Sequence, residues 1–278
     1  MRGWREPINH TLDCDILAGL LTAKYTCNAA IRQLSLACCF TGPGPLLFCG
    51  DIHVGASQPA FTVFWRMFPM IFAALGNIDG DARALESALA GIDAAGIQTI
   101  VHTGDCVGFG SAPNETLSLL RARAIPGVQG DMDRRVARFV RKQRTLRTEC
   151  APNVFSALQR TYDALHSEHV EYLAGLPRER RLVVDGITVY LCHGSPHGQD
   201  EGLLESDDAN RFRRFREMAR ADIVVMGHTP HPFSRMCDGV LFVNPGFLAG
   251  ECPCYAVVDT ETEPWSAAFH RPGDRVSP

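Results

Sequence analysis

The sequence predicts an α/β protein built in packed layers, and three observations support this. From residue 70 onward, short apolar and β-branched runs alternate with stretches of helical periodicity, as strands and helices do in layered folds. Five of the predicted strands end in a polar turn that contains glycine. Apolar residues make up 46% of the 278 residues, which is enough to bury a core and excludes disorder as the main state.

The first part of the layered domain has the patterns of strands joined by helices. Leu85, Leu89 and Ile92 recur at helical spacing and mark one apolar face. The stretch beginning at Pro113 opens a second helix, which carries Leu117. The strands predicted in this part are residues 70–75, 99–102 and 125–129.

The second part begins with a helical insert and ends in strands. Residues 134–176 have helical periodicity without a strand signal, so we expect them to form a helical layer or cap. The Asp185-Gly186 pair is a typical hairpin turn between two apolar runs. A helix that carries Phe212 and Phe215 follows. The strands predicted here are residues 182–184, 187–191, 223–226, 240–243 and 255–258, the last two as hairpin strands.

Charge and cysteine content narrow the possible functions. The chain has 27 basic and 31 acidic residues, a net charge of −4, so the whole molecule has no electrostatic attraction to nucleic acid or to an anionic membrane. The 11 cysteines include no Cys-x-x-Cys pair, which favours a reducing compartment and a cytoplasmic protein. The apolar run at 59–75 is broken by Arg66 and Pro69, so we expect no membrane span.

The five polar turns bring chemically related side chains to the ends of strands. In layered α/β proteins the carboxyl ends of the strands are where ligands bind, so these side chains are expected to converge. A mixture of carboxylates and imidazoles without clustered thiolates suits Mn²⁺, Fe or Zn²⁺. The turns contain Asn77 with Asp79, Asp105, Asp131 with Asp133, His193, and His228.

These motifs, taken in order, resemble those of the calcineurin-like metallophosphoesterases, in particular their small bacterial and archaeal phosphodiesterase branch. The resemblance implies a four-layer α-β-β-α sandwich at residues 70–272, with the helical insert inside it, an N-terminal extension at 1–69 and a tail at 273–278. The matching motifs, over residues 70 to about 250, are Gly104-Asp105, His193-Gly194-Ser195-Pro196, Gly227-His228-Thr229 and Asn244-Pro245-Gly246.

The resemblance also implies a set of metal ligands. Asp105 would be shared between two metals, and Asp131, His193 and His228 would complete one of the two sites. The other site would retain only Asn77 and Asp79 beside Asp105. The implied cofactor is a divalent metal, with Mn²⁺ first and Fe, Zn²⁺ or Ni²⁺ as alternatives. Clustered carboxylates repel one another without a cation, which favours bound metal over an empty pocket.

Several positions depart from the family's pattern. Asn77 and Asp79 stand where the family has Asp and His, Met132 replaces a His beside the phosphate, and Pro230 replaces a ligating His. Methionine cannot donate a proton, so a general-acid contribution of about 10²–10⁴-fold is missing unless Asp133 or water supplies it. His197 and His231 are alternatives, although loop histidines are usually solvated.

A basic segment directly follows the third polar turn. Arg134 and Arg135 are expected to reach a substrate phosphate. The remaining basic residues of 138–147 have the pattern of a solvated helix face, so we expect a phosphorylated small molecule or nucleotide as the partner, with nucleic acid unlikely.

The stretch Gly50-Asp51-Ile52-His53-Val54-Gly55 has the family's spelling of the first motif but the wrong spacing. Asp51 precedes Asp105 by 54 residues, whereas Asn77 precedes it by 28, the length of one helix and one strand. The altered copy at 77–81 is therefore predicted to occupy the site. A remaining hypothesis is that the extension folds back and lends His53 to the position beside Asp79.

Two functions remain open from the sequence. The first is a metal-dependent phosphoesterase, in which a metal-activated hydroxide attacks the phosphorus of a monoester or diester. The second is a catalytically degenerate relative that keeps a metal or phosphate pocket for sensing or scaffolding. The intact quartet of Asp105, Asp131, His193 and His228 favours the enzyme, and the substitutions at 77, 79, 132 and 230 favour the scaffold.

Overall fold

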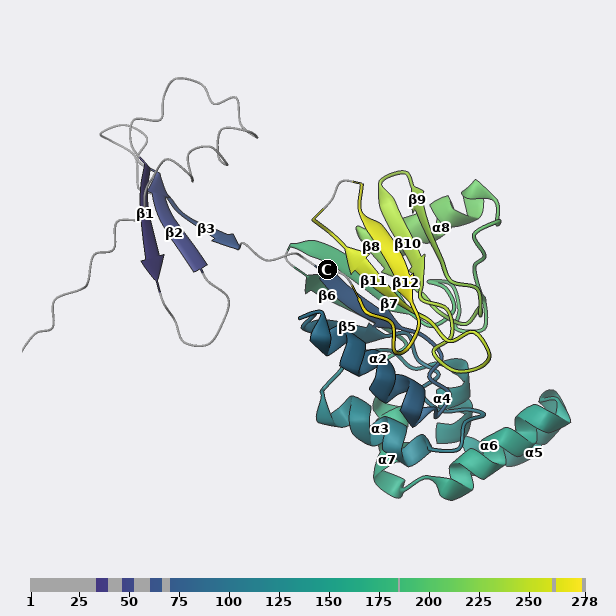
Figure 1. The fold of residues 1–278 in the computed structure, drawn as a ribbon. Coiled ribbons are helices and arrows are strands. Elements are labelled where there is room, and N and C mark those ends of the chain that lie inside the picture. Colours follow the sequence, from purple (N-terminus) through teal and green to yellow (C-terminus); the bar gives the residue numbers. More distant parts are fainter. Residues whose placement is uncertain are drawn as a thin grey trace, which may run out of the picture. The chain divides into compact units, whose positions relative to one another are not determined.

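The computed structural model of the chain describes residues 34–39, 47–52, 61–66, 71–184, 186–261 and 264–276. The chain divides into two compact units, Met1–Phe68 and Pro69–Pro278. Figure 1 shows the elements of each unit. Of the helices in the described residues, none has the length and apolar content that a membrane crossing requires.

The described part of the first unit is a three-stranded antiparallel sheet. Its strands are β1 (Leu34–Cys39), β2 (Leu47–Ile52) and β3 (Phe61–Arg66), with β2 in the middle. Asp51 lies within β2, opposite Ser35 on one side and Thr62 on the other. Asp51 is therefore part of a strand, not of a turn after a strand. His53 lies outside the described residues.

The second unit contains two mixed sheets. The four-stranded sheet has the order β12 (Ser266–His270), β11 (Tyr255–Asp259), β4 (Ile71–Leu75) and β5 (Thr99–His102), with β4 and β5 parallel. The five-stranded sheet has the order β6 (Glu179–Val184), β7 (Ile187–Cys192), β8 (Ile223–Val225), β10 (Val240–Asn244) and β9 (Phe233–Cys237). In this sheet β8 pairs in parallel with β7 on one side and with β10 on the other.

Alternation along the strands divides the core into layers. In β4, Phe72 and Ala74 point into the apolar cluster between the two sheets, whereas Ala73 and Leu75 point into the cluster on the outer face. The five-stranded sheet alternates in the same way, so Val224 of β8 faces a third cluster on its own outer face. Side chains of a strand alternate between faces with period two, so each sheet has two buried faces and needs a cover on both.

Helices provide these outer covers. The outer cluster of the four-stranded sheet takes in the apolar faces of the helices from α2 to α7, and α8 covers the five-stranded sheet (Figure 1). The predicted α-β-β-α sandwich with a helical insert is therefore confirmed. The helices are α2 (Ala82–Ala94), α3 (Pro113–Ala122), α4 (Asp131–Ala137), α5 (Phe139–Glu149), α6 (Pro152–Ala164), α7 (Ser167–Gly175) and α8 (Ala209–Ala219).

Two strand predictions need correction. The segment 125–129 forms only an isolated bridge between Gly127 and His102, because Pro126 has no N–H to donate and the Gln129 N–H bonds instead to the carbonyl of Pro177 at 2.7 Å. The strands β10 and β11 do not pair with each other as a hairpin. They lie in different sheets, where β10 pairs with β8 and β9 and β11 pairs with β4 and β12.

Candidate metal centre

The polar turns after β4, β5, β7 and β8 meet at the carboxyl ends of these strands, where the two sheets come together. The backbone there is unusual, because four residues other than glycine have positive φ: Asn77 at 27°, Asp79 at 54°, Asp105 at 49° and His228 at 68°. Residues other than glycine rarely adopt positive φ, and those that do tend to occur at functional sites. The local backbone thus already marks this edge as the site.

Two carboxylates and two imidazoles form the centre of the cluster. The Nε2 of His193 lies 3.3 Å from Oδ2 of Asp105 and 3.2 Å from Oδ1 of Asp131. The Nδ1 of His228 lies 3.3 Å from the same His193 nitrogen and 3.4 Å from Oδ1 of Asp131. One donor atom from each of Asp131, His193 and His228 falls within 4.8 Å of the others. The structure therefore brings together all four residues of the predicted quartet.

Neighbouring groups orient these donors. The Nδ1 of His193 lies 2.8 Å from the carbonyl oxygen of Thr103, and since a carbonyl only accepts, Nδ1 carries the proton and Nε2 turns its lone pair to the centre. Arg135 pairs with the other oxygen of Asp131, one helical turn away. The N–H of Met132 donates to Oδ1 of Asp105 at 2.9 Å. These contacts fix the orientations of His193, Asp131 and Asp105 around the centre.

Burial and charge set the protonation of the cluster. Burial alone would raise the pKa of Asp131, but hydrogen bonds from His193 and His228 and the charge of Arg135 hold it below its usual range. Burial would lower the pKa of His193, but Asp105 and Asp131 raise it well above its usual value. A divalent cation fits the same donor set, because carboxylate oxygen and imidazole nitrogen are its common ligands.

Asn77 is tied into the cluster through both ends of its amide. Its Nδ2 donates to Oδ2 of Asp105 at 3.0 Å, and its Oδ1 accepts from the backbone N–H of His228 at 3.3 Å. The backbone N–H can only donate, so the amide orientation is fixed and its NH₂ faces the carboxylate. An N–H therefore occupies the side of Asp105 where the resembled family has a second carboxylate ligand.

Asp79 lies beside the quartet, beneath a glycine-rich loop. Its N–H donates to the carbonyl of Asp105 at 2.9 Å, and its Oδ1 lies only 2.1 Å from where a Cβ would stand at Gly108. Burial and the charge of Asp105 raise the pKa of this carboxyl to about 7. Among the described residues the group of converging donor atoms consists of Asp131, His193 and His228, and Asp79 meets Asp105 through its backbone, so Asp79 lies beside the quartet.

The two predicted catalytic residues have different environments. Asp133 is fully buried, and its oxygens accept the backbone N–H groups of Val107 at 3.2 Å and Gly130 at 3.0 Å. Burial and the nearby Asp105 raise the pKa of Asp133 to about 7. Asp133 therefore stabilises the Gly130 turn through these hydrogen bonds. Because its side chain has no exposed surface, it does not suit the role of a proton donor to substrate. Arg134 remains partly exposed, and both oxygens of Asp200 accept from it at 3.0 Å.

The remaining histidines of the region stay outside the cluster. His197 and His231 are exposed, and Pro230 is exposed beside His231. His102 is fully buried, its Nδ1 accepts from the N–H of Gly104 at 3.3 Å, and burial lowers its pKa to about 4. It is thus a neutral core histidine. The sequence interpretation missed the pairing of Arg135 with Asp131, although the i, i+4 spacing of the two residues on α4 could have indicated it.

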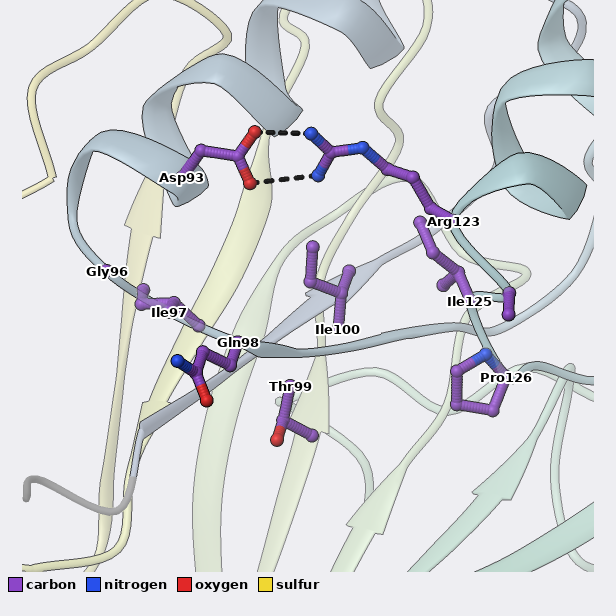
Figure 2. Close-up of a pocket in the computed structure, with 10 residues that line it drawn as sticks. Asp93, Gly96, Ile97, Gln98, Thr99, Ile100, Arg123, Ile125 and Pro126 are labelled. Carbon is purple, nitrogen blue, oxygen red and sulfur yellow. Dashed lines mark hydrogen bonds and ion pairs between the residues drawn. The ribbon is translucent and has the colours of Figure 1, made fainter. Parts of the chain in front are cut away.

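A separate pocket of about 640 Å³ lies at the amino end of β5, away from the polar turns. Figure 2 shows that Asp93 and Arg123 meet across it. The guanidinium donates to both carboxylate oxygens, so the charge that the pocket offers is already paired. The pocket also lies at the wrong end of the strand for a ligand site of this fold class.

Comparison with protein families identifies the class of this protein. The model of the calcineurin-like phosphoesterase superfamily domain matches residues 48–263, which is more than half of the chain. The chain therefore belongs to the calcineurin-like phosphoesterase superfamily, and the resemblance inferred from its motifs is confirmed. Members of this family use divalent metals, in agreement with the donor set at the strand ends.

Individual proteins are similar to this chain over roughly two thirds to three quarters of its length. The uncharacterized protein MJ0912 of Methanocaldococcus jannaschii is 26% identical over 185 residues, which are 65% of this chain and 70% of that protein. The hypothetical protein PH1004 from Pyrococcus horikoshii superposes with a TM-score of 0.66 at 21% identity, covering 72% of this chain and 87% of that one. A metallophosphoesterase from Sphaerobacter thermophilus superposes with a TM-score of 0.57 at 23% identity, covering 73% and 88%. The structural matches establish the shared fold.

Proposed function

We propose that this chain is a metal-dependent phosphoesterase that holds one divalent cation tightly, Mn²⁺ by preference, and hydrolyses phosphorylated small molecules or nucleotides. The observation that carries the proposal is the convergence of Asp105, Asp131, His193 and His228, combined with the amide of Asn77 on the other side of Asp105. The quartet supports one cation site. The amide donor in place of a carboxylate, together with Pro230, argues against a second tight site.

The cation, when bound, supplies positive charge to a phosphoryl oxygen and lowers the pKa of a water that attacks phosphorus. His228 is the most exposed member of the quartet, with 28% of its side chain accessible, so substrate approaches from its side. Arg134 is a partly exposed cation in the last turn of α4 and binds a phosphate oxygen when Asp200 moves away. The thioether of Met132 donates no proton to a leaving group. The proposed enzyme therefore favours esters whose leaving groups depart without protonation.

A second candidate function is a metal-binding scaffold without turnover. The specific observation in its favour is that Met132 takes the place of the family's histidine and is 6% exposed, while Asp133 is fully buried. No acid is therefore presented from this turn. The two functions differ in one measurable property, which is hydrolysis that depends on the quartet.

The test combines metal content with hydrolysis. We expect the protein, after loading with Mn²⁺ and gel filtration, to retain about one ion per chain and to hydrolyse p-nitrophenyl phosphate or bis(p-nitrophenyl) phosphate. Asp105→Ala should lose both properties, whereas Asp93→Ala, which removes a carboxylate from the remote pocket, should keep both. If the protein retained metal but showed no Asp105-dependent hydrolysis of any ester in a broad panel of phosphoesters, the enzyme would be refuted and the scaffold function would be supported. Failure to retain metal would refute the site.

The same proposal includes a reducing, cytoplasmic location. The six cysteines whose side chains the structure describes are free thiols, and four of them are buried. Unpaired thiols are typical of proteins from reducing compartments. Fractionation of the source cells, followed by immunodetection, would test this location, and recovery in an exported fraction would contradict it.

A further inference from the structure

A cavity of about 670 Å³ lies next to the metal centre, and Asp79, which lies beside the quartet, is one of the residues that line it. The backbone N–H of Asp79 donates to the carbonyl of Asp105. A residue of the cavity wall is therefore hydrogen-bonded to a residue of the quartet. The volume lies within the range of about 300–1,000 Å³ that is typical of small-molecule sites. A group attached to a phosphate at the quartet would therefore have room beside it.

One wall of the cavity presents an aromatic ring to solvent. Phe109 is 52% exposed, although it lies in a short loop between two core elements. The loop is fixed, because Gly110 donates to the carbonyl of Asp79 at 2.6 Å and Ala112 donates to the carbonyl of Gly80 at 3.0 Å. A Cβ at Gly110 would lie 2.4 Å from the carbonyl oxygen of Asp79, so only glycine allows this approach. The backbone beside Phe109 is thus held in place, and the ring lies at the surface, outside the core.

A second ring also lines the cavity, and its loop is attached to the same turn. Phe247 lines the cavity and is partly buried. Its loop is fastened by Leu248 N–H to the carbonyl of Gly76 at 3.0 Å and by Ala249 N–H to the carbonyl of Asn77 at 3.3 Å. Both aromatic walls are therefore fixed to the turn that also holds Asn77 and Asp79, and their separation does not depend on a flexible segment.

We propose that this cavity binds the aromatic base of a nucleotide substrate, with Phe109 and Phe247 contacting the base while the phosphate lies at the quartet. The inference rests on the proposed phosphoesterase function and names the substrate class of that site. A preorganised aromatic ring stacks on the face of any base, so the site would accept several bases. Arg83, an exposed cation on the same cavity, suits the negative charge of a nucleotide.

The test measures binding separately from catalysis. Calorimetric titration of the Mn²⁺-loaded protein compares adenosine 5′-monophosphate with ribose 5-phosphate, which carries the same phosphate without a base. We expect the nucleotide to bind about 5- to 150-fold more tightly, the range for base stacking on one aromatic side chain. Phe109→Ala should bring this ratio close to one, Phe109→Trp should preserve it, and Phe247→Ala should reduce it. Phe269→Ala, which removes another exposed ring on β12, should leave it unchanged.

The outcomes separate this inference from the proposed function. Equal affinity for the two phosphates in the wild-type protein would overturn the inference, and so would a ratio that survives both Phe109→Ala and Phe247→Ala. Preference for the nucleotide without hydrolysis of any phosphoester would support the base site and refute the enzyme. Hydrolysis of phosphoesters without a preference for the nucleotide would support the enzyme and refute the base site. Thermal unfolding of each variant identifies those that lose binding through loss of structure.

Discussion

Replacing Asn77 by aspartate tests how the cluster is balanced in the absence of metal. In the wild-type protein the amide of Asn77 donates to Oδ2 of Asp105 at 3.0 Å. In Asn77→Asp, a carboxylate oxygen faces the same carboxylate oxygen, so a favourable hydrogen bond becomes a repulsion. The same change restores the residue that the family's motif has at this position.

The size of the effect follows from this contact. Two unit charges 3.0 Å apart repel by about 5 kcal/mol at an effective dielectric constant of about 20. Protonation of one carboxyl limits the cost, because holding a proton at pH 7 on a group with an ordinary pKa of about 3.9 costs about 4 kcal/mol, and at pH 5 about 1.5 kcal/mol. We therefore expect the free energy of unfolding of the metal-free variant to fall by about 3–4 kcal/mol at pH 7, or roughly 10 °C in Tm.

The sign of the pH dependence follows from the direction of the shift. The paired carboxyl has a raised pKa in the folded state, so the deficit is absent below the unfolded pKa and grows as the pH rises through neutrality. Urea denaturation in EDTA at pH 5 and pH 7 measures it. Added Mn²⁺ should shrink the deficit, because a second cation then offsets the repulsion, and metal analysis should find about one more ion per chain than in the wild type.

A matched control separates this effect from the chemistry of the substitution. Asn153→Asp makes the same change at an exposed position in the first turn of α6, where a negative charge meets the positive end of the helix, so its stability should change by less than about 1 kcal/mol. A metal-free Asn77→Asp protein as stable at pH 7 as the wild type would refute the inferred contact. A deficit that does not shrink with Mn²⁺ would refute the idea that the amide replaces a ligand.

Three further predictions concern neighbours of the quartet. Met132→His should raise kcat/KM by about 10²–10⁴-fold for alkyl phosphoesters and much less for p-nitrophenyl esters, since only the former need a proton donor; equal gains for both would contradict this reason. Asp133→Ala should lower the free energy of unfolding by about 2–5 kcal/mol in urea denaturation, because it leaves the N–H groups of Val107 and Gly130 unpaired, and a loss below about 1 kcal/mol would be inconsistent with those bonds. Asp200→Asn should tighten the binding of inorganic phosphate several-fold in calorimetry, because it frees Arg134; unchanged or weaker binding would exclude that competition.

The site was predictable from the sequence where it depends on order along the chain. Each polar turn follows a segment that the sequence predicts as a strand, so Asp105, Asp131, His193 and His228 could be assigned to one edge before their positions were known. The structure brings these four together. The environment of Asp133 was not predictable, because its burial depends on Val107 and Gly130 closing over it from two segments. A carboxylic acid at this position suggested a proton donor, but the hydrogen bonds of Asp133 show that it stabilises the Gly130 turn.

The amino-acid sequence by itself determined the layered class, the family and the helical insert, because these follow from periodicity, motif order and spacing. Only the tertiary structure decided that β10 and β11 lie in different sheets and that Phe109 stands exposed beside the metal centre. It also decided which end of the Asn77 amide faces Asp105. These features depend on contacts between segments far apart in the chain, and a local pattern carries no record of which segments will meet.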